Sequence, residues 1–304
     1  MANRLRDVID SAYTHGRYTY SSFRKVSAIA TSAGCWADLS MAPGNPVPNY
    51  YVGDQMMATV PDVVAGSYNW YKKGIWHGGS VAPYKKFLHK ICMVGTGAGA
   101  APATFFLCDY LMFYPLIDMD STDEQLFINY GAIETDTTSP DADVLPRYTE
   151  GVGVQAFLVA TNPYIGGQYF QLKYTNSAGV ANRYSAVTIT NTATLIGTIL
   201  NSGTAGVRRS GAFVELQQGD LGIRSVQSIQ FFASNGGLAT LVLVRPIATM
   251  MTREPTAWAE FDFIKDKPSL PRIIDGAYLN WLVLSSATIA AVPIIGEITT
   301  IWSE

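Results

Sequence analysis

The sequence predicts an all-β protein built from antiparallel β-sandwiches of jelly-roll type, with an extended N-terminal arm and one short N-terminal helix. From residue 88 onward the chain runs in short bursts of β-branched and aromatic residues, bounded by Gly, Asn, Asp and Pro. Turn signals such as Asn-Ser-Ala-Gly at residues 176–179 and Asn-Ser-Gly at residues 201–203 separate these bursts. Many short strands with closely spaced turns indicate antiparallel sheets rather than a parallel sheet with crossover helices.

Helical periodicity is confined to the start of the chain. Residues 3–13 place Leu5, Val8, Ile9 and Ala12 on one side of a helix, which predicts a short amphipathic helix there. The strands that we expect are residues 88–94, 103–117, 153–161, 168–175, 184–190, 195–200, 211–217, 223–233, 238–247, 277–284, 287–292 and 296–302.

Residues 213–247 contain the clearest pair of predicted strands. Val226 and Ile229 lie before the Asn235-Gly236 turn, and Leu241 lies after it. Apolar residues on both sides of such a turn predict a β-hairpin. The sequence Gly-Asp-Leu-Gly at residues 219–222 predicts a tight corner just before it.

Composition along the chain predicts three parts. Residues 1–87 form the arm, because MAPGNPVPNYYVG at residues 41–53 carries too many prolines and glycines for a helix or a central strand. Residues 151–248 form an inserted β-sandwich. Residues 88–150 plus 249–304 form an outer β body around it.

The low charge of the chain indicates a protein that buries much of its surface. Of the 304 residues, 48% are hydrophobic and 15% are charged, against the roughly 25% charged residues usual for soluble proteins. Obligate interfaces are poor in charge, so this composition is typical of an assembled protein as well as of one with a large core. The net charge of −3 provides no general attraction for nucleic acid or for an anionic membrane.

Targeting and membrane signals are not expected from this sequence. The first residues, MANRLRDVIDSAYTHG, carry charges where a secretion signal needs an apolar centre. The longest apolar stretches, residues 111–117 and 287–295, are too short to span a bilayer as a helix. Arg208, Arg209 and the N-terminal arginines are too few to predict a nucleic-acid partner.

The glycine-rich stretch at residues 90–111, KICMVGTGAGAAPATFFLCDYL, raises the question of a dinucleotide site. A dinucleotide fingerprint needs a third glycine and a helix directly after it. Ala100 occupies the third glycine position, and the residues that follow are aromatic and apolar like a strand. We therefore expect Gly95, Gly97 and Gly99 to form a permissive loop between two strands, with no nucleotide cofactor.

The sequence predicts no catalytic or metal-binding residues. Cys35, Cys92 and Cys108 form no CxxC pair and have no neighbouring base, which indicates buried thiols in a reducing compartment. The three histidines share no metal-ligand spacing, and a structural role is expected for His77 in the sequence Ile-Trp-His-Gly-Gly.

An acidic cluster is the best metal alternative in the chain. Asp118, Asp120, Asp123 and Glu124 supply oxygen ligands of the kind that Ca²⁺ prefers, but they lack the spacing of an EF-hand loop. A solvated loop with a capping arrangement at residues 121–124 is the preferred interpretation.

Two stretches resemble structural proteins of tailed-bacteriophage virions. They are Ala-Pro-Gly-Asn-Pro at residues 42–46 followed by Tyr50-Tyr51, and Gly-Asp-Leu-Gly-Ile-Arg-Ser-Val at residues 219–226. The chain is most similar to head proteins of the decoration, cement or minor capsid type, which combine an extended arm with a β-sandwich. This resemblance implies a non-enzymatic, many-copy virion protein, made in the host cytoplasm, often a homotrimer that binds the major capsid protein or other virion proteins.

Aromatic residues of the arm are the predicted interface anchors, because buried aromatic side chains dominate the affinity of most interfaces. The predicted anchors are Tyr50, Tyr51, Tyr68, Trp70, Tyr71 and Trp76.

Three alternatives remain open: a carbohydrate-binding β-sandwich that stacks sugars on exposed aromatic residues, a tail-associated virion protein, and an enzyme whose site is assembled from distant loops. The sugar-stacking residues would be Trp70, Tyr71, Trp76 or Trp258, and the enzyme would bring Asp118, Asp120 and His77 together.

Overall fold

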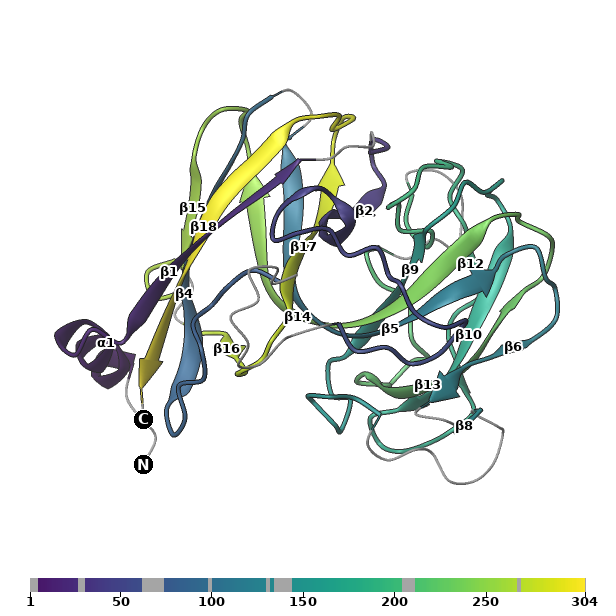
Figure 1. Ribbon diagram of the computed structural model, residues 1–304, viewed down its shortest axis with the longest axis horizontal. Helices are drawn as coiled ribbons and strands as arrows, with labels where there is room; N and C mark the ends of the chain where they lie inside the picture. The colour runs from purple at the N-terminus through teal and green to yellow at the C-terminus, as the bar shows by residue number, and fades with distance from the viewer. Residues whose placement is uncertain are drawn as a thin grey trace.

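The computed structural model describes residues 5–26, 31–61, 74–97, 100–129, 132–133, 144–203, 211–266 and 269–303. Within these residues the protein has one α-helix and strands that pair antiparallel, which confirms the all-β prediction (Figure 1). The elements are α1 (Leu5–Thr14), β1 (Tyr18–Val26), β2 (Trp36–Asp38), the 3-10 helix η1 (Leu39–Met41), β3 (Gly44–Asn45), β4 (Lys85–Gly95), β5 (Ala103–Asp118), β6 (Gln125–Leu126), β7 (Ile128–Asn129), β8 (Ala132–Ile133), β9 (Gln155–Ala160), β10 (Tyr169–Asn176), β11 (Arg183–Tyr184), β12 (Thr188–Ile189), β13 (Ile223–Phe231), β14 (Leu238–Thr252), β15 (Ala259–Asp262), β16 (Arg272–Ile273), β17 (Leu279–Ser285) and β18 (Pro293–Ser303).

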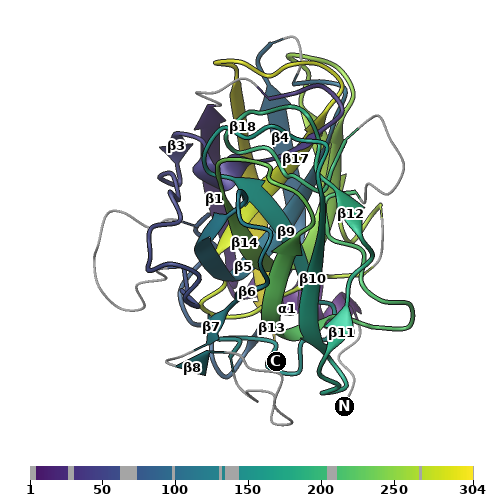
Figure 2. The same cartoon turned by 90° about the vertical axis from the view of Figure 1, so that its right-hand side faces the viewer.

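The described strands form three larger sheets and the small β7–β8 ribbon. The first sheet has the order β15-β4-β18-β1-β3, with β16 also paired to β4. The central sheet has the order β2-β17-β5-β14-β9, and the third sheet has the order β11-β10-β13-β6, with β12 on β10. Figure 2 views the molecule from the side of β10 and β13, with the strands of the first sheet behind them.

Two long strands of the central sheet join the two lobes of the molecule. β5 and β14 pair with each other from Leu238 opposite Asp118 to Thr252 opposite Ala103. One end of this pair lies in the lobe of the first sheet, and the other end lies in the lobe of the third sheet (Figure 1). The central sheet is therefore shared by both lobes.

A β-bulge keeps both lobes on the same face of the central sheet. Side chains alternate between the two faces of a strand, and Leu241 and Leu243 of β14 face the core under the third sheet. The pairing of β14 with β5 shifts between Pro246 and Ala248, after which Ala248 and Met250 face the core under the first sheet. The shift of one residue restores the inward direction, so one face of the central sheet packs against both other sheets.

The opposite face of the central sheet has an aromatic core of its own. Val242 and Val244, which alternate with the leucines, pack there with Tyr110, Phe157 and other buried residues. Segments from the predicted arm cover this face, since Trp36 and Tyr51 belong to the same cluster. Part of the arm is thus a layer of the fold itself.

The predicted hairpin around Asn235-Gly236 is wrong. β13 pairs with β10 and β6, whereas β14 pairs with β5 and β9, so the turn carries the chain from one sheet to another. The reason is that Ile229 of β13 and Leu241 of β14 are both fully buried in the same core. Both strands present their apolar faces to this core from opposite sides, so they pack face to face instead of pairing edge to edge.

The N-terminal region contains one confirmed element and one that the sequence did not predict. The predicted helix exists as α1, which packs Val8 and Ala12 against Ile301 of β18. β1 was not predicted, but it pairs with β18 along its whole length, from Tyr18 opposite Ile301 to Val26 opposite Pro293. Its inward residues include Ser21 and Lys25, so the apolar alternation that marks a strand is missing.

Other predicted strands differ from the structure. Residues 211–217 and 287–292 form no strand, and residues 195–200 make only isolated bridges, at Thr198 and Ile199. The predicted domain division stays a prediction. Its boundary between residues 248 and 249 falls inside β14, and the boundary between residues 87 and 88 falls inside β4. No described helix has the length and apolar character needed to cross a membrane.

The glycine-rich stretch joins two strands, as the sequence predicted, although Gly95 is the last residue of β4 and not part of the loop. β4 ends at Gly95 in the first sheet, and β5 begins at Ala103 in the central sheet, so the loop crosses between the two sheets. A Cβ atom on Gly95 would lie 2.2 Å from the Cβ atom of the buried Ala100. Gly95 is needed here for a close approach of the chain to itself. Gly99 lies outside the described residues.

We expect Gly95→Ala to lower the free energy of unfolding by about 1–3 kcal/mol, because the added methyl group must displace Ala100. Urea unfolding measures this change. Gly79→Ala is the matched control, since its Cβ would meet no atom closer than 4.0 Å. Equal stability of the two variants would show that the loop adjusts freely.

Candidate interaction surface

The predicted aromatic anchors differ in their exposure to solvent. Tyr50 is 67% exposed, whereas its neighbour Tyr51 is buried in the aromatic core of the central sheet. Trp76 is 45% exposed and lies against the ring of His77. Tyr68, Trp70 and Tyr71 lie outside the described residues.

Tyr51 belongs to a buried polar cluster around Asp38. The Asp38 carboxylate accepts hydrogen bonds from the hydroxyl groups of Tyr51, Tyr110 and Ser40, and from the Ser40 backbone N–H. Burial raises the pKa of Asp38, and these hydrogen bonds oppose that rise. Tyr51 therefore fixes the arm to its own fold.

Lys25 of β1 also fixes the arm to the fold, through hydrogen bonds to the arm's backbone. Its ammonium group is fully buried and donates hydrogen bonds to the carbonyl oxygens of Ser40, Ala42 and Pro46, at 3.4, 3.0 and 2.8 Å. Burial lowers the pKa of Lys25 to about 8, and the charge of Asp38 opposes this effect. Lys25 of β1 thereby holds the proline-rich segment at residues 41–53, which includes one of the two stretches that resemble phage virion proteins.

We expect the stability of the protein, relative to that of a Lys25→Met variant, to rise between about pH 8 and pH 10.5. In this interval the unfolded chain still binds a proton at Lys25 that the native state has lost, so raising the pH favours the native state. The difference amounts to roughly 3 kcal/mol over the interval. Urea unfolding at several pH values measures it, with exposed Lys85→Met as the control. A pH-independent difference would contradict the assigned environment of Lys25.

His77 lies in a buried network under the loop that carries Trp76. Its Nε2 atom lies 2.9 Å from the carbonyl oxygen of Ala277, and its Nδ1 atom accepts a hydrogen bond from Lys86 at 3.2 Å. Lys86 is also paired with Asp275 at 2.9 Å. These bonds tie the loop to the chain before β17, which agrees with a structural role for this histidine.

The structure does not bring the acidic cluster to His77. Asp118 accepts a hydrogen bond from the backbone N–H of Asp120, and Asp120 accepts one from Ser234. Glu124 accepts a hydrogen bond from Ser228 of β13. The acidic residues therefore connect the loop after β5 to its neighbours in and beyond the third sheet.

Residues 219–222, which begin the second stretch that resembles phage virion proteins, form a corner before β13, as predicted. Asp220 accepts hydrogen bonds from Tyr174, Asn176 and Arg183. Gly219 and Gly222 have positive φ angles of 89° and 154°. The corner ties the chain to β10 and β11 of the third sheet.

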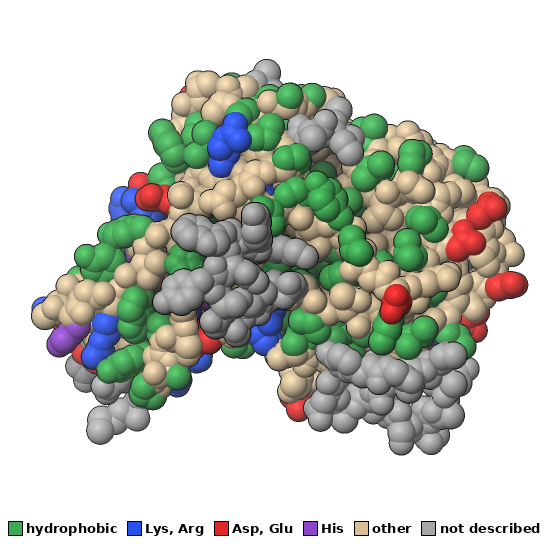
Figure 3. Space-filling model, viewed as in Figure 1, with side chains coloured by type: hydrophobic (Ala, Val, Ile, Leu, Met, Phe, Trp, Pro, Cys, Tyr) green, Lys and Arg blue, Asp and Glu red, His purple; other side chains and the backbone are tan. Residues whose placement is uncertain are grey.

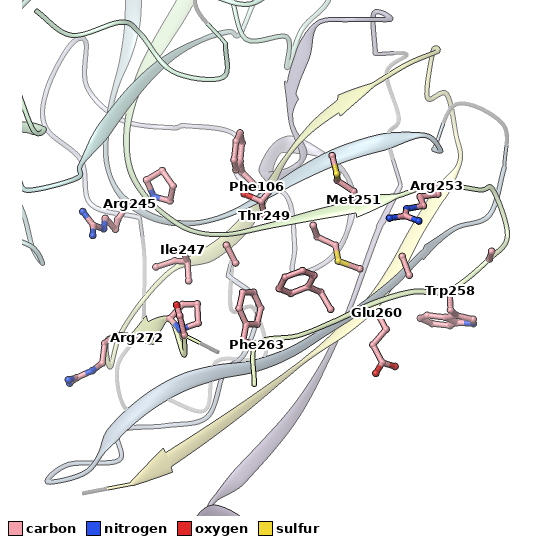
Figure 4. A pocket seen from close by; sticks show the side chains of 18 of the residues that line it. Phe106, Arg245, Ile247, Thr249, Met251, Arg253, Trp258, Glu260, Phe263 and Arg272 are labelled. Atoms are coloured by element: carbon pink, nitrogen blue, oxygen red, sulfur yellow. The ribbon is translucent and has the colours of Figure 1, made fainter. Parts of the chain in front are cut away.

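One open site of the described structure is a groove of about 900 Å³ between β14 and β15. Beyond Val244, where the pairing with β9 ends, β14 is paired only with β5 among the described strands. Within the described part of the chain, β15 is paired only with β4. The groove therefore lies between two strand edges, one from the central sheet and one from the first sheet (Figure 4).

Apolar side chains of the core between these two sheets line the groove. Ile247 and Met250 come from β14, and Phe261 and Phe263 come from β15 and the residue after it. Figure 4 shows Ile247 and Phe263 between the two strands. The sandwich is thus open along this side, and a bound molecule would meet apolar residues inside and strand edges on both sides.

Charged residues lie at the two ends of the groove. Arg245 and Arg272 lie at one end, whereas Arg253, Trp258 and Glu260 lie at the other end (Figure 4). Tyr148 lies at the same end of the groove as Arg245 and Arg272. Burial raises the pKa of Tyr148 to about 12, and the positive charges of the nearby arginines oppose this rise.

Sequence reasoning missed this groove, because it ended one strand at residue 247 and predicted no further strand before residue 277. One signal was present in Pro246. A proline cannot donate a hydrogen bond to a neighbouring strand, so within a strand it occurs at an open edge or a bulge. Pro246 lies at the bulge, just past the last pairing of β14 with β9.

The outer surface agrees with the low charge of the sequence. Figure 3 shows apolar side chains spread over both lobes, with acidic side chains gathered toward the lobe of the third sheet. Exposed large apolar residues include Val52, Met251, Trp258 and Leu221, at 81%, 61%, 60% and 69% exposure.

Comparisons with known proteins assign no family to the chain. No protein-family model matches it, and no curated protein matches it. Among solved structures the chain is similar to the crystal structure of the infectious bursal disease virus VP2 subviral particle, at 7% sequence identity over 94% of this chain and 81% of that chain. The TM-score of this match is 0.15, a value that carries no argument about fold or function.

Proposed function

We propose that this chain is a non-enzymatic structural protein of a viral particle, which binds and stabilises a capsid lattice through self-association and extended segments. The observation that carries the proposal is the groove between β14 and β15, where two strand edges lie beside apolar core residues. Unpaired strand edges are templates for pairing with another chain. Such a site suits binding to polypeptide, which is what a subunit of an assembly does.

The placement in a virion rests on the resemblance to decoration and cement proteins of tailed phages. We include in the proposal a jelly-roll connectivity for the sandwiches, a homotrimer as the assembled form, and the major capsid protein or other virion proteins as partners. The charge-poor surface with exposed Val52, Met251 and Leu221 supports such contacts, because interfaces are depleted in charged residues.

A mass measurement of the native protein in solution, combined with imaging of purified particles, tests the proposal. We expect a trimeric mass and density for this chain at regular positions of a particle lattice. A protein that stays monomeric at all concentrations and is missing from every particle fraction would overturn the proposal.

A carbohydrate-binding function is the second candidate. The observation that favours it is the exposure of two indole rings, at 45% for Trp76 and 60% for Trp258. Exposed aromatic rings of this kind stack on the apolar faces of sugars. Binding on a glycan array that is lost in Trp76→Ala or Trp258→Ala would support this function, and an array without binding would remove it.

A further inference from the structure

We propose that the groove between β14 and β15 binds an extended segment of a partner polypeptide whose C-terminal end carries acidic residues. This inference rests on the proposed function and adds the chemistry and direction of the bound segment. Its basis is the pairing of the two strands, the side chains inside the groove and the charges at its ends.

The two strand edges have the geometry to pair with one inserted strand. Residues 245–252 of β14 (eight residues) are paired with β5, and no other described strand pairs with them. A strand of this length spans about 27 Å. β15 presents its own edge on the other side of the groove, with β4 as its partner. A bound strand would extend either sheet and close the open side of the sandwich.

The apolar lining fits the alternation of an extended chain. Every second side chain of a strand points to the same face. Ile247, Met250, Phe261 and Phe263 would receive the inward set, and the outward set would remain in solvent. A compact ligand would leave the backbone groups of the two strand edges unpaired, whereas an extended peptide can pair with these edges and also contact the apolar lining.

The direction of the bound segment follows from β14. The connection of residues 253–258 reverses the chain between β14 and β15, so a strand between them runs antiparallel to one and parallel to the other. Antiparallel pairs outnumber parallel pairs in proteins, and β14 offers the longer edge. A segment antiparallel to β14 places its C-terminal end beside Arg245, where β14 enters the groove.

The charge at that end selects the chemistry of the segment. Arg147 is neutralised by Asp109, at 2.6 Å. Arg245 donates a hydrogen bond to the carbonyl oxygen of Val152, and no described carboxylate lies within ion-pair distance of Arg245 or Arg272. Arg272 is exposed. Two arginines without acidic partners favour carboxylate groups, which accept their hydrogen bonds in fork geometry.

Peptide binding to the full chain tests the proposal. The probe is an eight-residue peptide of alternating valine and threonine that ends in two glutamates, with a fluorescent label at its N-terminus and an amide at its C-terminus. The matched peptide ends in two lysines. We expect the glutamate peptide to bind at least about tenfold more tightly in fluorescence anisotropy, with a preference that weakens as salt increases. Methylation of its alternate backbone nitrogens should weaken binding about tenfold or more, because strand pairing is lost.

Charge reversal locates the site. Arg272→Glu should remove or invert the preference for the glutamate peptide, whereas Arg253→Glu at the other end of the groove should keep it. The proposal is overturned if neither peptide binds at millimolar concentration, if both bind equally, if N-methylation has no effect, or if Arg253→Glu acts like Arg272→Glu.

Failure of this inference can be distinguished from failure of the proposed function. Peptide binding by a protein that stays monomeric and outside particles would keep the groove assignment and remove the structural role. A trimeric, particle-bound protein that binds neither peptide would keep the structural role and remove the groove assignment.

Discussion

Asp109→Ala is expected to lower the free energy of unfolding by about 3–5 kcal/mol, because it leaves the Arg147 guanidinium buried without its counter-charge. Arg147 donates two hydrogen bonds to Asp109, at 2.9 and 2.6 Å, and the side chains are 11% and 0% exposed. The backbone N–H of Tyr278 also donates to Asp109, at 2.9 Å, and would lose its acceptor. Urea unfolding measures the loss.

A double-mutant cycle separates the ion pair from the packing. Arg147→Met in the Asp109→Ala background removes the charge that lost its partner. The double variant should therefore be more stable than the sum of the two single losses predicts. Asp10→Ala is the exposed control, since Arg6 and Asp10 are 88% and 66% exposed and should change stability by about 0.5 kcal/mol or less. Strict additivity in the cycle would mean that the two side chains do not depend on each other.

Acidification is expected to destabilise the protein through His77. Burial, with a smaller effect of the Lys86 ammonium group, lowers the pKa of His77 to about 4, against about 6.5 in an unfolded chain. Between these values the unfolded chain binds a proton that the native state does not bind. The stability that His77 contributes is therefore fully present above about pH 6.5 and is lost as the pH falls toward 4, by roughly 3 kcal/mol in total.

The measurement compares unfolding free energies at several pH values between about 4 and 7 for the natural protein and His77→Gln. The variant should lose roughly 3 kcal/mol of the pH dependence in this interval, while a part remains from His89, whose pKa burial also lowers. His15→Gln changes an exposed histidine and retains His77, so it should follow the natural protein. A His77→Gln variant with an unchanged pH dependence would assign the acid sensitivity to other groups.

Several strands could be predicted because their signals are local. β5, β9, β10 and β14 combine β-branched or aromatic residues with flanking turn residues, and they exist within a few residues of the predicted bounds, except that β14 extends to Thr252. β1 was missed for an equally local reason. Its buried positions include Ser21 and Lys25, whose burial depends on acceptors that other segments supply.

Sheet membership could not be predicted, because it depends on contacts between distant residues. The turn at Asn235-Gly236 has the residues of a hairpin, yet β13 and β14 lie in different sheets. The choice is made by the burial of Ile229 and Leu241 from opposite sides of one core. Nothing near the turn carries that information.

The predicted anchors show the same limit. Tyr50 and Tyr51 are neighbours with the same side chain, but Tyr51 is buried because Asp38, Tyr110 and Ser40 surround its hydroxyl group. Tyr50 is 67% exposed. Tyr51 has a positive φ of 50°, so the chain turns at this residue. Composition alone cannot predict such a turn, and it therefore cannot separate an internal anchor from an external one.

By itself, the sequence determined that this protein is all-β, that its N-terminal region contains one short helix, and that Gly97 lies in a loop between two strands. These properties follow from residue type, periodicity and turn chemistry over a few neighbouring positions. The tertiary structure alone decided which strands share a sheet, that the proline-rich arm segment covers the central sheet, and that β14 and β15 leave a groove between them. The groove depends on the bulge at residues 246–248 and on where β9 stops pairing with β14, and both arise from contacts between residues far apart in the chain.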